Sequence, residues 1–303
     1  MADGRALLPD DVRERIARLE VSAYGLVEGA IAGLHRSPYH GFSVEFAQHR
    51  EYTWGDELKH VDWKVFARTD RYYVKQYEEE TNLQATVLLD ASASMLYRGS
   101  RASASKYEYG ATVTAALAHV VLRQQDQAGL ALFGDRTLVR LPPSAHPAQL
   151  RRMLEAMAGV TPAGESGRPP VLHEVAEELP RRGLVVVVSD LLFPPEALVD
   201  GVRHLRHRGH EVVVLHVLDP DEVDFPFDDV TRFEGLEVDS RLLVDPRALR
   251  DAYLEGLGAH LRAVEEGCST ARADYARLDT RTPVATALPR WLNHRARRRG
   301  RPQ

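Results

Sequence analysis

Cysteine and long apolar runs are the first things that this sequence lacks. The 303 residues include one cysteine, Cys268, which excludes an internal disulfide framework and a zinc site built from cysteines. No apolar run approaches the roughly 20 residues that a membrane helix needs. The acidic start, MADGRALLPDDVRERI, lacks the apolar core of a secretory signal. We therefore expect a cytoplasmic protein with no membrane span.

Lysine is also scarce, since only four of the 39 basic residues are lysines. We interpret this as codon bias rather than function. The net charge of −5 argues against nucleic-acid binding, which would depend on the basic tail Arg295–Gln303 alone. With 44% hydrophobic and 27% charged residues, the composition is that of a globular protein of about two domains.

Motifs of common enzyme classes are missing. Neither a P-loop nor a G-x-G-x-x-G string occurs, and there is no G-x-S-x-G nucleophile elbow. His173-Glu174 lacks the second histidine of a zinc protease helix, so we predict that this pair lies on a helix surface. Three later histidines are spaced by three, but the last of them lies beyond the likely helix end near Gly209, and we do not expect them to bind metal (His204, His207 and His210). The acidic stretch Asp219–Asp229 lacks the spacing of a calcium loop, and we predict a solvated loop there.

From residue 83 onward, short aliphatic runs alternate with segments of helix length. Helix-length segments separated by short apolar strands predict a parallel sheet with helices on both faces, an α/β fold of the Rossmann-like kind. The predicted strands are Leu83–Leu89, Gly129–Phe133, Thr137–Leu141, Leu184–Val188, Val212–Val217, Thr231–Phe233 and Leu242–Val244. The predicted helices are Lys106–Arg123, Pro147–Met157, Val171–Leu179, Glu196–Arg206, Pro246–Glu266 and Pro283–His294.

The first 81 residues have a different composition. Apolar residues recur at helical spacing over Val12–Leu34, and the stretch Gly41–Glu80, dense in aromatic and charged residues, alternates enough to predict strands. We expect four aromatic residues to form the core of this module (Trp54, Trp63, Phe66 and Tyr72) and its charged residues to lock it to the sheet (Arg50, Asp56, Asp62 and Arg68). The predicted organisation is a helix with a strand-rich module over residues 1–81, a sheet domain over 82–294 and a disordered basic tail over 295–303.

Two strand ends carry residues of the kind that bind hard metal ions. Asp90, Ser92 and Ser94 follow the first predicted strand in the string DASAS, and Asp190 follows a later aliphatic strand. In an open α/β sheet, ligands bind outside the carboxyl ends of the strands, and alternate residues of an extended segment point the same way. The four side chains are therefore expected to converge on a site for Mg²⁺ or Mn²⁺. The alternative is a capped turn in which the serines satisfy loop amides.

These residues, and the segment before them, resemble known families. Asp90-x-Ser92-x-Ser94 with a later strand-end Asp190 is similar to the metal-ion-dependent adhesion site (MIDAS) of von Willebrand factor A domains. The preceding segment resembles the bacterial and archaeal family called domain of unknown function 58. It reproduces the pattern of that family without a gap, in Ser37, Gly41, Glu45-Phe46, Arg50-x-Tyr52, Gly55-Asp56, Asp62-Trp63, Ala67-Arg68 and Glu80.

The resemblance implies a von Willebrand factor A-like sheet domain and a metal-binding role for five residues (Asp90, Ser92, Ser94, Ser166 and Asp190). Ser166 stands where the adhesion site takes a threonine from a second loop, but Gly167 replaces the aspartate that often follows that threonine. This departure makes Ser166 the least certain ligand of the set. The metal is expected to be weakly held.

The family resemblance also implies a partner. Members commonly accompany a MoxR-type AAA+ ATPase, which implies a non-enzymatic adaptor that acts with this ATPase on a client protein during assembly or maturation. The alternative is a magnesium-dependent phosphoester hydrolase. Hydrolysis also needs a positioned base or a second metal, and the sequence ties no histidine or lysine to Asp90 or Asp190. We therefore predict no catalytic residue.

Overall fold

The computed structural model describes residues 14–15, 17–19, 43–53, 62–80, 83–164, 170–179 and 182–299. The chain forms two compact units, a small unit of residues 36–83 and a sheet unit of residues 1–35 and 84–303. The described part of the predicted first helix, Glu14–Arg15 and Ala17–Leu19, is helical. It belongs to the sheet unit rather than to the module that follows it in sequence.

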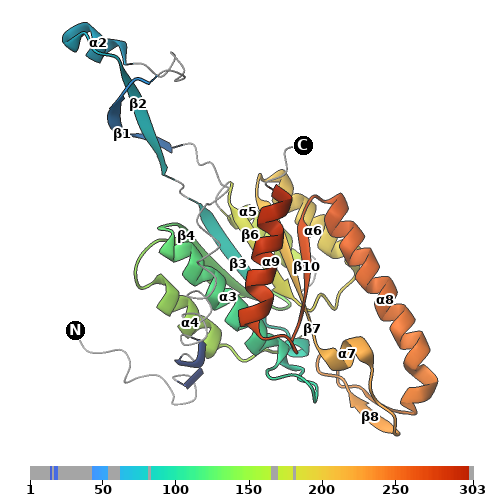
Figure 1. The fold of residues 1–303 in the computed structure, drawn as a ribbon. Helices are drawn as coiled ribbons and strands as arrows, with labels where there is room; N and C mark the ends of the chain where they lie inside the picture. Colours follow the sequence, from blue (N-terminus) through green and yellow to red (C-terminus); the bar gives the residue numbers. More distant parts are fainter. Residues whose placement is uncertain are drawn as a thin grey trace, which may run out of the picture. The chain divides into compact units, whose positions relative to one another are not determined.

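The small unit is a twisted hairpin with one helix in its connection (Figure 1). Strand β1 (Ser43–Glu51) pairs antiparallel with β2 (Tyr73–Glu80), and a bulge between Phe46 and Gln48 shifts the register. Helix α2 (Trp63–Thr69) lies between the two strands in sequence. The Oδ1 atom of Asp62 accepts the backbone N–H of Val65 at 3.3 Å, which caps this helix. Trp54, predicted as a core residue of this module, lies outside the described residues, as does the rest of the segment 54–61.

The described aromatic side chains around α2 contact one another. The rings of Phe66 and Tyr72 stack with centroids 4.5 Å apart, and Trp63 meets Phe66 edge-on at 6.1 Å. Trp63 and Tyr72 are nevertheless exposed, so the prediction that they are core residues is wrong. The described elements of this unit, a two-stranded hairpin and a seven-residue helix, provide too few side chains to enclose these rings.

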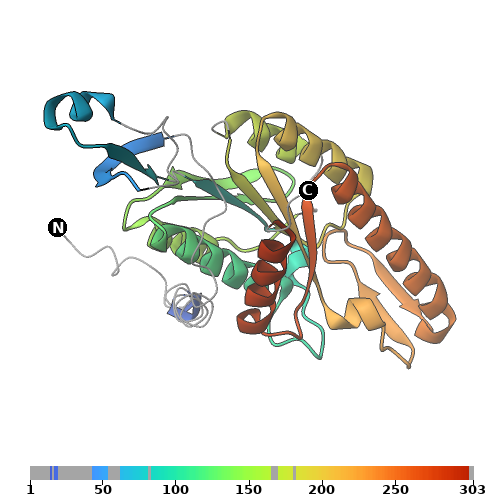
Figure 2. The same cartoon turned by 45° about the horizontal axis from the view of Figure 1, so that its top comes forward.

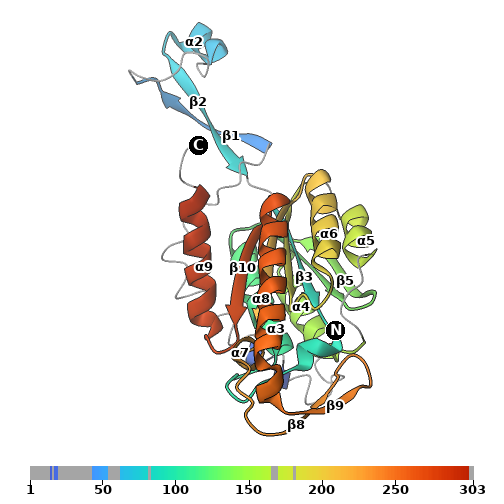
Figure 3. The same ribbon diagram turned by 90° about the vertical axis from the view of Figure 1, so that its right-hand side faces the viewer.

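The sheet unit has a six-stranded sheet between two layers of helices, as the sequence predicted (Figures 1 and 3). Helices α3, α4 and α9 cover one face, and α5, α6 and α8 cover the other. Its strands are β3 (Gln84–Asp90), β4 (Gln127–Phe133), β5 (Thr137–Ser144), β6 (Leu184–Ser189), β7 (Glu211–Leu218) and β10 (Asp274–Asp279). Its helices are α3 (Lys106–Arg123), α4 (Gln149–Gly159), α5 (Pro170–Glu178), α6 (Pro195–His207), α7 (Pro220–Asp224), α8 (Pro246–Thr270) and α9 (Val284–Arg299).

The strand order across the sheet is β10-β7-β6-β3-β4-β5. All neighbours are parallel except β4 and β5. After β3, the chain adds β4 and β5 on one side of that strand. It then adds β6, β7 and β10 on the other side. Such a reversal makes the carboxyl ends of β3 and β6 the topological switch point, where open α/β sheets bind their ligands.

Two features of the sheet unit differ from the sequence prediction. Strand β10 was not predicted, because its sequence, DYARLD, has the mixed polarity of a partly exposed edge strand. Helix α9 continues to Arg299, so the predicted disordered tail does not begin at residue 295. The guanidinium of Arg295 pairs with Glu211 and, at 2.9 Å, with Asp274, and these contacts attach the helix to the sheet.

The carboxyl edge of the sheet also carries a small hairpin. Strands β8 (Thr231–Glu234) and β9 (Arg241–Val244) pair antiparallel in a separate two-stranded sheet. The hairpin and α7 lie at the lower edge in Figure 2, together with the loop between β3 and α3. None of the described helices is long and apolar enough to cross a membrane.

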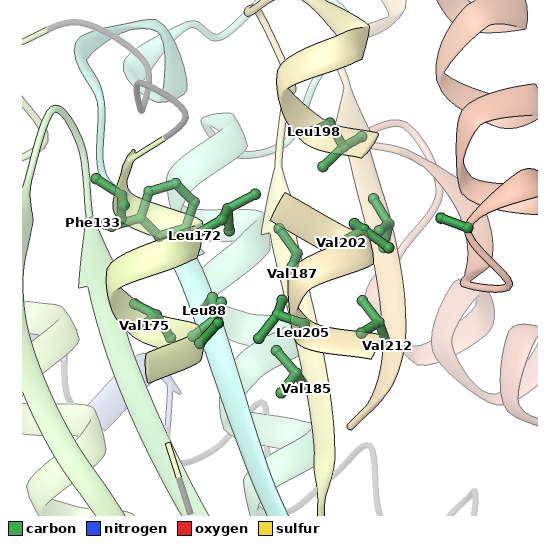
Figure 4. Packing of buried hydrophobic residues seen from close by; sticks show 14 of the residues in the cluster. Leu88, Phe133, Leu172, Val175, Val185, Val187, Leu198, Val202, Leu205 and Val212 are labelled. Carbon is green, nitrogen blue, oxygen red and sulfur yellow. The ribbon is translucent and has the colours of Figure 1, made fainter. Parts of the chain in front are cut away.

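The central strands are buried on both faces, and one half of the core lies between the sheet and α5, α6 and α8 (Figure 4). Leu88 of β3, Val187 of β6 and Val202 of α6 are completely buried there. Strands that are covered on both sides have continuous aliphatic sequences rather than alternating ones, and LVVVVS of β6 is an example. This packing fixes the positions of the strand ends.

Leu88→Ala should lower the free energy of unfolding by about 2–5 kcal/mol, because a buried leucine loses transfer free energy and leaves a cavity. Leu243→Ala is the matched control, since Leu243 of β9 is 70% exposed and its loss should change stability by at most about 0.5 kcal/mol. Denaturant unfolding measures both. Equal effects of the two substitutions would contradict the assigned core.

Candidate metal centre

The two aspartates predicted as metal ligands lie on neighbouring strands at the switch point. Asp90 is the last residue of β3 and Asp190 follows β6 directly. The two strands are parallel neighbours, with Leu89 opposite Val188 in the register. The prediction that these strands are adjacent is confirmed.

Asp90 is fully buried, and both of its carboxylate oxygens accept hydrogen bonds. Oδ1 accepts the backbone N–H of Ser92 at 2.9 Å, and Oδ2 accepts the hydroxyl of Ser189 at 2.6 Å. Burial and the nearby charge of Asp190 raise the pKa of Asp90 to about 7, against these hydrogen bonds. The chain alone therefore does not fully compensate an ionised Asp90.

The two predicted serine ligands are buried beside Asp90. Ser92 stands before the short 3₁₀ helix Ala93–Leu96, but its side chain makes no capping hydrogen bond to that helix. Its Oγ instead lies 3.1 Å from the Oγ of Ser94. The two hydroxyls therefore lie side by side just after the carboxyl end of β3.

Asp190 has a partner that the sequence analysis missed. Its Oδ2 accepts a hydrogen bond of 2.7 Å from the ammonium of Lys106, the first residue of α3. The same ammonium donates a hydrogen bond of 2.6 Å to Oε1 of Glu222. Oδ1 of Asp190 is buried and has no hydrogen-bond partner in the described part of the chain. The expectation that no lysine accompanies these aspartates is wrong, because the chain places Lys106 beside Asp190 only after folding.

Lys106 is 0% exposed, which makes it a buried cation between two carboxylates. Burial alone would lower the pKa of Lys106, but Asp190 and Glu222 outweigh burial and hold this pKa above its usual range. Burial raises the pKa of Glu222, and the ammonium opposes that shift. Removing one partner of a buried ion pair typically costs 3–5 kcal/mol, so this ammonium has a structural role whatever else it does.

His216 on β7 holds the backbone of Asp190. Its Nε2 lies 2.8 Å from the carbonyl oxygen of Asp190, and its Nδ1 lies 2.9 Å from the hydroxyl of Tyr275. A carbonyl can only accept, so Nε2 carries the proton and Nδ1 accepts from the tyrosine. Burial lowers the pKa of His216 to about 4, and the ring stays neutral near pH 7. The histidine orients the loop and, being enclosed, is not available as a base.

The first part of the acidic stretch after β7, Asp219–Asp224, forms a capped helix that holds the loop before α3, whereas Asp228 and Asp229 lie in an exposed loop as predicted. Oδ2 of Asp219, a buried residue, accepts the backbone N–H of Gly99 at 2.9 Å. Oδ2 of Asp221 accepts the N–H of Ser100 at 2.7 Å, and its Oδ1 accepts Nε of Arg101 at 2.6 Å. A Cβ at Gly99 would lie 2.3 Å from a carboxylate oxygen of Asp219. These contacts hold the loop that leads into Lys106.

The structure therefore brings four of the five predicted metal ligands into one buried cluster, namely Asp90, Ser92, Ser94 and Asp190. Ser166 lies outside the described residues. The described part of its loop starts beside the cluster, since the carbonyl of Gly164 accepts the N–H of Ala93 at 2.9 Å. That these residues hold a metal remains a prediction.

Two of the histidines that were not expected to bind metal, His173 and His204, connect helices α5 and α6. Nδ1 of His173 on α5 lies 2.8 Å from Nδ1 of His204 on α6, and Nε2 of His204 lies 2.8 Å from Oε1 of Glu177. His210 lies beyond the end of α6 and is buried. Across the described ranges, no group of three or more His, Cys, Asp or Glu side chains is arranged to hold a metal. A metal at the switch point would therefore depend on hydroxyls as well as on the two carboxylates.

The donor set at the switch point fits a small hard cation. All the candidate donors are carboxylate or hydroxyl oxygens, which suit magnesium or manganese rather than zinc or copper. The orphaned Oδ1 of Asp190 is an unsatisfied buried acceptor, and native structures seldom leave such an atom unpaired. A cation or a cation-bound water would satisfy it.

Fold and site together define a doubly wound α/β domain with a polar cluster at its switch point. The chain belongs to the family described as protein of unknown function DUF58, whose model matches residues 48–263. The family predicted from the signature residues is confirmed.

The chain is also similar to several relatives and solved structures. The chain is 28% identical over 266 residues to the uncharacterized proteins Rv1480 of Mycobacterium tuberculosis and Mb1516 of Mycobacterium bovis, covering 86% of this chain and 78% of each of those. It is similar to BatB from Bacteroides thetaiotaomicron, at 14% identity and a TM-score of 0.43, over 71% of this chain and 99% of that chain. It is also similar to the SpRpn10 VWA domain, at 13% identity and a TM-score of 0.38, over 70% of this chain and 95% of that chain.

The raised pKa of Asp90 predicts a specific pH dependence in protein kept free of metal by a chelator. The carboxyl titrates near 3.9 when unfolded and near 7 when folded. Between these values the folded state holds a proton that the unfolded state has lost, so this residue makes stability fall as pH rises from about 4 to 7. Asp90→Asn removes the penalty and should gain on the order of 4 kcal/mol relative to wild type between pH 4 and pH 8.

Denaturant unfolding at several pH values measures this difference. Asp251→Asn is the matched control, because Asp251 is exposed on α8 and makes no contribution to the cluster. If the gap between Asp90→Asn and wild type is the same at pH 4 and pH 8, the assigned environment of Asp90 is wrong.

Proposed function

We propose that this protein is a non-enzymatic interaction module whose docking surface is the switch-point cluster loaded with Mg²⁺ or Mn²⁺. In this proposal Asp90, Ser92, Ser94 and Asp190 hold the ion directly or through water, and Ser166 completes the set. When bound, the ion supplies an electrophilic centre with an exchangeable position that a carboxylate of a partner can fill. We assign no catalytic residue.

The observation that carries the proposal is the unsatisfied Oδ1 of Asp190 at the switch point. The apolar residues around the cluster support docking of another protein. Leu96 and Leu192, each two positions after a candidate ligand, are 44% and 50% exposed. A polar centre with exposed apolar side chains beside it has the composition of a protein interface, where the buried anchors supply most of the affinity.

The groups beside Asp190 do not support phosphoester hydrolysis. Lys106 is buried and paired with two carboxylates, and His216 is neutral with both ring nitrogens occupied. Neither is free to take a proton from a water molecule. Hydrolysis needs a positioned base or a second metal in addition to the first ion.

The resemblance to domain of unknown function 58 supports a MoxR-type AAA+ ATPase as the partner, with a client protein whose assembly or maturation the pair assists. We propose a cytoplasmic location for this work. Because desolvating the ion and two carboxylates offsets much of their attraction, the metal contact should add specificity more than affinity.

The test measures binding of the purified protein to the purified MoxR-type ATPase encoded in the same genome. Binding should be lost in a chelator and restored by Mg²⁺. Ser92→Ala/Ser94→Ala should weaken it by at least about tenfold, the effect of roughly 1.4 kcal/mol, with little change in melting temperature. Asp90→Ala should abolish metal binding in calorimetry.

Ser269→Ala is the matched control, because Ser269 is exposed on α8, and its binding should equal that of wild type. Unchanged binding in the chelator would break the link between metal and partner. Phosphoesterase turnover that depends on Asp90 would instead support the hydrolase.

A further inference from the structure

Lys106 is the one cation among the described residues that touches the candidate ligand Asp190. Its Nζ lies 2.7 Å from Oδ2 of Asp190 and 2.6 Å from Oε1 of Glu222, and the side chain is 0% exposed. The rest of the cluster is acidic or neutral. The chain therefore already places a positive charge where a divalent ion would be attracted.

Position 106 is occupied by a lysine rather than by an arginine. Lysine occurs only four times among 39 basic residues, yet a lysine holds this position. An ammonium is a compact charge that can bond two carboxylates in a small enclosed space, whereas a guanidinium is a wide planar fork. The capping box of α3, in which Ser105 and Glu108 bond each other's backbone, fixes the start of the helix and so the origin of this side chain.

The two oxygens of Asp190 have different roles in this arrangement. The ammonium donates to Oδ2, while Oδ1 has no hydrogen-bond partner among the residues that the structure describes. A carboxylate held by one oxygen presents the other in a fixed direction. It can then serve a metal through one oxygen only, in competition with a charge already bonded to it.

We propose that Lys106 is the built-in counter-ion of the switch-point site: it neutralises Asp190 when no divalent ion is present, orients Oδ1 toward the ion, and limits metal affinity by charge repulsion. Glu222 sets the strength of this effect, because it shares the ammonium with Asp190. The inference rests on the metal site of the proposed function and adds the residue that regulates it.

This role predicts opposite effects for the two partners of the ion pair. Lys106→Met keeps most of the side-chain length and removes the charge, so Mn²⁺ affinity should rise at least about tenfold, since like charges at a few ångströms repel strongly in a protein interior. Glu222→Gln leaves the ammonium to Asp190 alone and removes a nearby negative charge. It should lower Mn²⁺ affinity by about threefold or more.

A control variant comes from the contacts between α7 and the loop before α3. Arg101 bonds Asp221 and Asp224 of α7 but makes no contact with Asp190. Arg101→Gln should lower the melting temperature while leaving Mn²⁺ affinity within about twofold of wild type. A general loosening of this end of the sheet unit would lower metal affinity in all three variants, so the sign of the change separates a counter-ion from a purely structural lysine.

The experiment is calorimetric titration of the full chain and the three variants with Mn²⁺, with the Mn²⁺-induced shift in melting temperature as a second readout. Tighter binding by Lys106→Met and weaker binding by Glu222→Gln support the proposal. Equal or weaker binding by Lys106→Met overturns it, as does the absence of binding in every variant. If Lys106→Met does not fold, an unchanged or raised affinity in Glu222→Gln overturns it.

One further outcome separates this inference from the proposed function. Binding of Mn²⁺ by Lys106→Met but not by wild type would support the counter-ion role of Lys106. The same result would contradict metal-dependent docking by the natural chain.

Discussion

The structure at the carboxyl end of the sheet depends on the charge of two aspartates, Asp90 and Asp190, which are buried at the ends of adjacent strands. An ionised carboxylate can be buried only if other groups compensate its charge. The two aspartates are compensated by different groups. Asp90 accepts hydrogen bonds from the hydroxyl of Ser189 and from a backbone N–H, but burial and the charge of Asp190 still raise its pKa to about 7. Asp190 receives the ammonium of Lys106. The site thus combines a carboxyl that tends to hold a proton with one that holds a cation.

Much of the surrounding structure serves to place that cation. Helix α7 supplies Glu222 as the second partner of the ammonium, and Asp219 and Asp221 hold the loop before α3. His216 bonds the backbone of Asp190 from the neighbouring strand. These groups come from widely separated parts of the chain and meet because β7 lies beside β6 and β6 beside β3. A cation that displaced the ammonium of Lys106 from Asp190 would therefore also change the contact of this ammonium with Glu222 of α7.

The parts of the fold that sequence could predict are those determined by local pattern. Aliphatic runs such as Leu184–Val188 are strands because both faces are covered, and Asp90 and Asp190 could be paired because parallel strands end at one edge. Lys106 could not be assigned in this way. It lies 84 residues from its partner, and its one signal in the sequence, the rarity of lysine, was interpreted as codon bias. Strand β10 and the exposed rings of Trp63 and Tyr72 were missed because edge pairing and enclosure depend on neighbours rather than on local pattern.

The central claim, a divalent ion held at the switch point, is tested most directly by anomalous X-ray scattering from crystals soaked in Mn²⁺. The account predicts an anomalous peak within coordination distance of the Ser92 and Ser94 hydroxyls and of Oδ1 of Asp190, or joined to that oxygen by one water. Crystals with Mn²⁺ bound elsewhere, or with Lys106 on Asp190 and no peak in the cluster at saturating Mn²⁺, would contradict it.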